Sequence, residues 1–237
     1  MLKNFMIVAI GITVLIGVAP AHAQFGLDSV SNLVGGGDSN SANNSGSLKE
    51  DAAKFSHYLS VGTVNLIKAV AKMHEAVGEA DKAKADLAQA ELLAKGGTEI
   101  KAEELKKRWS VVDNSAFNRA DFAKVSTQKG QELLVSSGIH LGAGMIVDKK
   151  ALSLAQSIVT KTPSAQDLMD GSIMNAFELA KLAVEVLPGH IKKSGSWTTD
   201  LADYFSSHKL EAPSTEDFKK QISSDLPANE NNDLYSD

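Results

Sequence analysis

The chain contains no cysteine. This absence excludes a disulfide framework, a thiol nucleophile, thiolate ligands for zinc or an iron–sulfur cluster, and covalent attachment of haem. A chain of 237 residues can bury roughly two thirds of the surface that it exposes when unfolded, so its fold does not depend on such cross-links.

Long apolar runs are also absent, except at the N-terminus. Lys3 precedes an almost unbroken apolar run over residues 5–18, and Ala21-His22-Ala23 forms a small-x-small cleavage site. This order is typical of a secretory signal peptide over residues 1–23. The run is shorter than the ~20 residues that a membrane-spanning helix needs, and no later segment is sufficiently long and apolar. The sequence therefore predicts a periplasmic or secreted protein with no transmembrane anchor after signal cleavage.

The chain has no excess of basic residues either. Its formal net charge is −5, and residues 211–237 alone hold seven acidic residues and two lysines. The rest of the predicted mature chain, residues 24–210, is nearly neutral, at about −1. Because nucleic-acid binding needs a basic face, no nucleic acid is expected among the partners.

Changes in composition divide the chain into four segments. The signal peptide is followed by a flexible linker rich in Gly, Ser and Asn (residues 24–47), a helical domain (48–226) and an acidic tail expected to be disordered (227–237). Apolar residues at helical spacing near the start of the linker leave open whether residues 24–34 form a short docking helix.

One long helix is predicted at the start of the helical domain. Ser47, with Glu50 three residues later, has the signature of a capping box. Apolar residues then recur at heptad spacing, which is typical of helix-on-helix packing. The predicted interaction seam consists of Leu59, Leu66, Val70, Met73 and Val77. The pattern leaves open whether this seam faces the protein's own core or another chain. Alanine then dominates residues 78–95, which are expected to continue the helix as a more exposed extension.

The remaining helix boundaries are predicted from caps and helix breakers. Later helices are expected to begin near Thr98, Ser115, Pro163, Trp197 and Ser214, with Pro188-Gly189 ending the helix that begins at Pro163. No strand signal extends beyond a few residues. The sequence therefore predicts an all-α fold, an irregular bundle of about five to seven helices with one long N-terminal helix.

The segment 137–147 is apolar and unusually rich in glycine. Gly138 and Gly142 lie four residues apart, so on a helix they form a flat strip that a neighbouring element can approach closely. Each glycine costs roughly 0.5–1 kcal/mol relative to alanine in a helix interior, so close packing or a helix break is expected to compensate. His140 in this segment is interpreted either as a hydrogen-bonded structural residue or as a polar group that recognises a ligand.

Six residues make up the predicted ligand-binding set. Four come from the glycine segment, and two are tryptophans that either line a pocket or fill junctions between helices. The set is Gly138, His140, Gly142, Met145, Trp109 and Trp197.

Recognisable catalytic and metal-binding motifs are absent. No two of the five histidines after residue 23 lie three to five positions apart, so no helix face presents a paired metal-ligand set. No nucleophile motif occurs. The sequence thus predicts no metal, no cofactor and no enzymatic activity. The expected function is that of an exported binding protein with an interaction or scaffold role, with a protein partner or self-association. The alternative is a carrier of a small apolar or lipid-like ligand in a pocket around residues 138–147.

Overall fold

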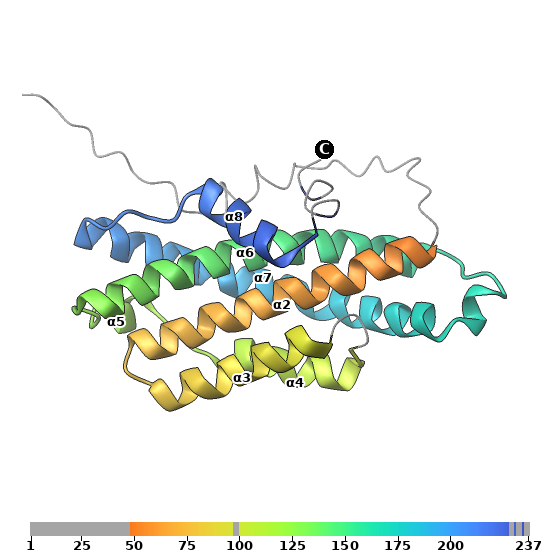
Figure 1. The fold of residues 1–237 in the computed structure, drawn as a ribbon, viewed down its shortest axis with the longest axis horizontal. Helices are drawn as coiled ribbons and strands as arrows, with labels where there is room; N and C mark the ends of the chain where they lie inside the picture. The colour runs from red at the N-terminus through yellow and green to blue at the C-terminus, as the bar shows by residue number, and fades with distance from the viewer. Residues whose placement is uncertain (1–47, 97–99, 228–229, 231–233, 235–237) are drawn as a thin grey trace, which may run out of the picture.

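A computed structural model describes residues 48–96, 100–227, 230 and 234 (Figure 1). The predicted signal peptide, the linker with its segment 24–34, and the capping residue Ser47 lie outside the described residues. Within these ranges the only regular elements are helices, without a β-strand, which confirms the predicted all-α class. The elements are α2 (Leu48–Ala76), α3 (Ala80–Gly96), α4 (Ala102–Asn114), α5 (Arg119–Phe122), α6 (Gln128–Thr160), the 3-10 helix η1 (Asp167–Met169), α7 (Gly171–His208) and α8 (Thr215–Asp225).

Three long helices, α2, α6 and α7, form the centre of the bundle. Figure 1 shows α3 and α4 along one side of this centre and α8 on the opposite side. The core between the long helices contains fully buried residues such as Phe55, Ile67, Leu141 and Leu187. No helix of the described ranges has the length and the apolar character needed to cross a membrane.

The long N-terminal helix is confirmed, but its expected extension through residue 95 is wrong. Gly78 adopts a φ of 90°, a conformation that only glycine reaches readily, and the chain turns there. Helix α3 then folds back along α2 and buries Ala83, Ala90 and Leu93. Most of α3 is nevertheless exposed, as expected, including Ala85, Ala88 and Ala94, while the small side chains of Ala83 and Ala90 let the helix pack closely on α2.

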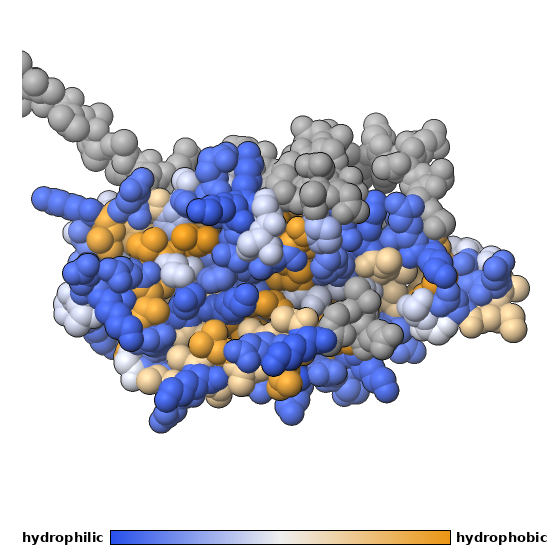
Figure 2. Space-filling view, in the orientation of Figure 1, coloured by the Kyte–Doolittle hydropathy of each residue, from blue (hydrophilic) through white to orange (hydrophobic). Residues whose placement is uncertain are grey.

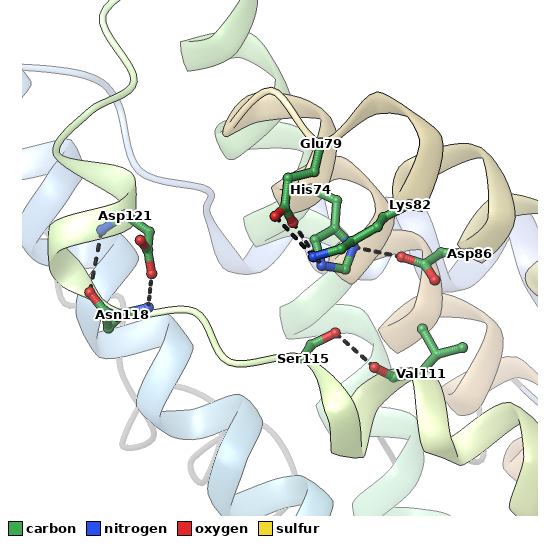
Figure 3. A network of polar contacts seen from close by, with 8 residues as sticks. All are labelled: His74, Glu79, Lys82, Asp86, Val111, Ser115, Asn118 and Asp121. Atoms are coloured by element: carbon green, nitrogen blue, oxygen red, sulfur yellow. Dashed lines mark hydrogen bonds and ion pairs between the residues drawn. The ribbon is translucent and has the colours of Figure 1, made fainter.

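A polar cluster stabilises this turn between α2 and α3. His74 Nδ1 lies 2.7 Å from Asp86 Oδ2 and His74 Nε2 lies 3.5 Å from Glu79 Oε2. The Lys82 ammonium group is 2.9 Å from Glu79 (Figure 3). Together these contacts connect the last turn of α2 to the first two turns of α3.

Helix α7 is longer than expected. It begins at the Asp170 cap, whose Oδ1 accepts from the Ser172 backbone N–H at 3.0 Å, and not near Pro163. It continues through Pro188 to His208, so the predicted stop at Pro188-Gly189 and the predicted start at Trp197 are both wrong. A proline inside a helix costs about 3 kcal/mol, but tertiary packing outweighs this cost because Leu187 and His190 beside it are buried.

The helix predicted to begin near Ser115 is not continuous, because Ser115 is the C-cap of α4 and only the short α5 follows, after an Asn118 cap. Helix α6 begins separately after a Thr127 cap and runs without interruption through the glycine segment. The predicted start at Ser214 is confirmed. Helix α8 starts at Ser214, which forms a capping box with Asp217.

Candidate binding site

Two glycines of α6, Gly142 and Gly144, each allow a different neighbouring helix to pack closely. This close packing offsets the free energy that each glycine costs in a helix. A Cβ atom at Gly142 would lie 2.5 Å from the Phe218 ring of α8, whereas one at Gly144 would lie 2.9 Å from Leu66 Cδ2 and 3.1 Å from the Gly62 carbonyl oxygen of α2. Residues two apart on a helix point in nearly opposite directions. Helix α6 therefore uses one glycine toward α8 on its outer side and the other toward α2 in the core.

Asp148 lies one turn beyond Gly144 on the core side of α6. Its side chain is completely buried against Gly62, where any Cβ atom would overlap the carboxyl group. Neither carboxyl oxygen has a hydrogen-bond partner among the described residues. Burial in this apolar surrounding raises the pKa of Asp148 well above its usual value, which favours the neutral carboxyl.

His140, one helical turn before Gly144 on the α2-facing side of α6, belongs to a connected chain of hydrogen bonds. His140 Nδ1 donates to Asn65 Oδ1 at 2.8 Å, and Asn65 Nδ2 donates to Asp225 Oδ2 of α8 at 2.9 Å. Burial lowers the pKa of His140 to about 4, helped by the positive charges of Lys68 and Lys72. The imidazole is therefore neutral at pH 7 and holds α2, α6 and α8 together through the fully buried Asn65.

The C-terminal part of the chain forms a strap over α2 and α6. We define the strap as α8 with Leu226, Glu230 and Leu234. Its apolar residues Phe218, Ile222, Leu226 and Leu234 are buried against the bundle. Beyond α8, the Tyr58 hydroxyl donates to the Glu230 carbonyl oxygen at 3.0 Å, and His57 Nδ1 lies 2.6 Å from Glu230 Oε2. These two described residues of the predicted acidic tail, Glu230 and Leu234, thus contact the body of the protein.

The predicted ligand-binding residues do not share one pocket. Gly142 faces Phe218 of the strap and His140 bonds Asn65 of α2, while Gly138 and Met145 are buried inside the bundle. Trp109 Nε1 donates to Thr63 Oγ1 at 3.0 Å, on nearly the opposite face of α2 from Asn65. Trp197 packs against Phe117, with 5.8 Å between ring centroids. Both tryptophans fill junctions between helices.

The predicted seam is placed in the interior of the single chain. Leu59, Leu66, Val70 and Met73 are at most 1% exposed, and Val77 is half-buried against the same core. In this conformation their side chains are not available to another chain.

An open groove lies on α6 beside the connection between α7 and α8. Its volume is about 420 Å³, and its lining residues are Gln128, Gln131, Glu132, Val135, Ser136, Ile139 and Leu210. Lys209 adopts a left-handed conformation with a φ of 56°, which turns the chain and places Leu210 over α6. Figure 2 shows apolar surface where α6 and this connection meet. The groove was not predicted from the sequence, although Val135 and Ile139, four residues apart on α6, were a local signal.

A second group of side chains, His190 with Asp113 and Ser194, has the composition of a catalytic triad but not its geometry. His190 Nε2 lies 2.7 Å from Asp113 Oδ1, and Ser194 follows one helical turn later. His190 Nδ1 and Ser194 Oγ are both buried, and neither has a hydrogen-bond partner among the described residues. Since Ser194 is 0% exposed, a substrate has no access to it.

No group of three or more potential metal ligands occurs in the described part of the chain. Comparisons with models of protein families, with curated proteins and with solved structures find no match.

Proposed function

We propose that this protein is exported and acts by binding, in an interaction or scaffold role in the periplasm or at the cell surface, rather than by catalysis. The observation that carries the proposal is the open groove between α6 and Leu210. The seam residues are buried against the protein's own core, so they are not available to a partner. The groove is the described surface that best suits one.

The chemistry of the groove favours a segment of another protein. Val135, Ile139 and Leu210 offer an apolar floor for one or two apolar side chains. Gln128 and Gln131 provide amide donors and acceptors that suit the polar backbone of a bound peptide. An apolar centre with a polar rim is the usual anatomy of a protein interface.

Site-specific photo-crosslinking in the producing cell tests this proposal. A photoreactive amino acid at Ser136 should give an adduct of defined mass, and the additional change Ile139→Glu should abolish it. The same amino acid at Glu103, an exposed position on α4, is the matched control. Equal labelling at both positions, or none at Ser136, would contradict binding in the groove.

A second candidate function is a carrier of a small apolar or lipid-like ligand around residues 138–147. The notch at Gly142 and the neutral His140 beside it favour this alternative. Phe218 fills the notch, so a ligand would have to displace α8. Native mass spectrometry of the mature protein from its own compartment distinguishes the two functions. A bound mass that is lost on denaturation and reduced by Gly142→Leu supports the carrier, whereas a bare chain supports the interaction role.

A further inference from the structure

We infer that this protein associates with itself head to tail, so that an apolar tip at one end of the bundle docks in the groove beside Leu210 of the next copy. The apolar tip consists of Leu168 and Met169 in η1, the short helix that connects α6 to α7. The inference rests on the proposed function, because it names a second copy of this chain as the partner for the groove.

The apolar tip exposes two neighbouring side chains to solvent. Met169 is 88% exposed and Leu168 is 56% exposed, more than any other large apolar side chain that the structure describes. A single exposed apolar residue is common at protein surfaces. Two adjacent ones form a small patch, and its burial against an apolar groove is favourable because it removes both side chains from water.

Hydrogen bonds next to the apolar tip hold it in one conformation. Ser164 donates its backbone N–H and its hydroxyl to Asp167 Oδ2, at 2.9 and 2.7 Å, and the Asp167 N–H donates to Ser164 Oγ at 3.2 Å. After Met169, Asp170 caps α7. Because the backbone of the tip is already ordered, its docking costs little conformational entropy.

The apolar tip cannot reach the groove of its own chain. It follows the C-terminal end of α6, whereas the groove lies near the N-terminal end of the same helix. From Ile139 to Thr160 the helix rises about 30 Å. Figure 1 shows the connection from α6 to α7 and the connection from α7 to α8 at opposite ends of the bundle. A tip in the groove therefore has to come from another molecule.

The apolar tip is flanked by negative charge. Asp167 and Asp170 stand on either side of it in the sequence, and hydrogen bonds from Ser164 and Ser172 respectively lower the pKa of their carboxyls, that of Asp170 to about 2. Both carboxyls are therefore ionised at pH 7. Lys49 contacts Asp170 at 3.4 Å, whereas Asp167 forms no ion pair with a described residue.

The side of the groove toward α2 has the opposite charge. Ser136 lines the groove, and His140 follows it one helical turn later on α6. Lys68 and Lys72 of α2 are close enough to His140 to lower its pKa, and neither forms an ion pair with a described residue. Their two positive charges exceed the single negative charge of Glu132 in the lining. A second copy thus offers a tip whose charge and apolar side chains both match the groove.

Sedimentation velocity of the mature protein and of single variants tests the inference. Met169→Glu disables the apolar tip and leaves the groove, whereas Ile139→Glu disables the groove and leaves the tip. Leu92→Glu is the matched control, because Leu92 is an exposed leucine on α3, at 52%, away from both surfaces. Concentrations extend to about 1 mM, where the weak contacts of a small interface are populated.

The wild type and Leu92→Glu should form dimers and longer assemblies as the concentration rises. Met169→Glu or Ile139→Glu alone should associate at least about tenfold more weakly. An equimolar mixture of these two variants should form dimers and nothing longer, because it combines one intact tip with one intact groove. Photo-crosslinking from Ser136 should give an adduct with the mass of two chains.

Three results would overturn the head-to-tail contact: a wild type that stays monomeric, a Met169→Glu variant that associates as strongly as the wild type, or a mixture without dimers. An adduct of another mass at Ser136, together with a monomeric wild type, overturns this inference and leaves the proposed function intact. The absence of any adduct at Ser136 contradicts the proposed function and this inference with it.

Discussion

Two contacts of α6, one with α2 and one with α8, solve the same packing problem with opposite treatment of a polar group. On the core side, Gly144 and Gly62 bring α6 and α2 together, and Asp148 is buried beside them without a partner. On the outer side, Gly142 receives Phe218 of α8, and the polar link to α8 runs from His140, on the α2-facing side of α6, through Asn65 to Asp225. Both contacts use a glycine to admit a neighbour.

This difference separates a fixed contact from a removable one. The core side places backbone against backbone, so a change there moves a long helix. The outer side places a side chain of α8 against α6, and its polar groups are satisfied by a helix attached through a short connection. A series of polar groups whose hydrogen bonds are all satisfied specifies one docking position. An unpartnered acid in the core instead costs free energy when it ionises.

Leucine at the two glycines should give the largest contrast. Gly144→Leu has to displace the Gly62 carbonyl oxygen, which belongs to the backbone of α2, and should lower the free energy of unfolding by about 3 kcal/mol or more. Gly142→Leu has to displace only the Phe218 ring and should cost about 1–2 kcal/mol. Urea unfolding followed by circular dichroism measures both. Equal losses would contradict the distinction between the two sides.

Asp148→Asn should remove a pH dependence of stability. The pKa of Asp148 is raised in the folded state, so its contribution is fully present below the unfolded pKa of 3.8 and is lost as pH rises through the folded pKa. The wild type should therefore lose about 1.4 kcal/mol relative to the variant for each pH unit within that window. Urea unfolding between pH 4 and pH 8 (about one curve per unit) checks this. A constant difference between the two proteins would show that the carboxyl does not titrate on unfolding.

His140→Gln should reveal the opposite pH dependence in the polar link from α6 to α8. The pKa of His140 falls from 6.5 to about 4 on folding. Its contribution is therefore present above pH 6.5 and is lost as pH falls toward the folded pKa, by up to about 3 kcal/mol. Glutamine keeps an amide donor for Asn65 but does not titrate in this range. The stability of wild type relative to variant should fall between pH 7 and pH 4 (roughly the window set by the two pKa values). A parallel pH profile for both proteins would contradict the assignment.

A double-mutant cycle at Gly62 and Asp148 should give the smallest effect. Gly62→Ala is destabilising because its methyl group meets the Asp148 carboxyl. Asp148→Ala removes that obstacle, so the two changes together should be about 1–2 kcal/mol less destabilising than their sum. The control pairs Gly62→Ala with Asp113→Ala, an exposed position on α4, and should be additive within about 0.5 kcal/mol. An additive result for Gly62 and Asp148 would show that the two residues are not in contact.

Much of the helical architecture follows from local patterns. The seam residues from Leu59 to Met73 were recognisable by their spacing, because a 3.6-residue period places them on one face of α2. The capping box at Ser214 and Asp217 marked the start of α8, since capping bonds form within one turn of the chain. The glycine segment indicated close packing, because glycine costs free energy in a helix interior and a compensating contact is expected. The boundary at Gly78 was missed although glycine is itself a local signal for a turn, whereas the boundary at Pro188 was misjudged because tertiary packing outweighs local tendency by a few kcal/mol.

By itself, then, the sequence determined the all-helical class, the faces that enter the core and the region of close approach in α6. Only the tertiary structure decided which neighbour meets each glycine, that Asp148 is buried without a partner, and that the strap covers His140. It also formed the groove, by placing Leu210 beside Val135 and Ile139. The physical reason is that periodicity and capping depend on residues within a few positions. Burial, pKa and surface shape depend instead on groups that are distant in the chain and meet only when the helices pack.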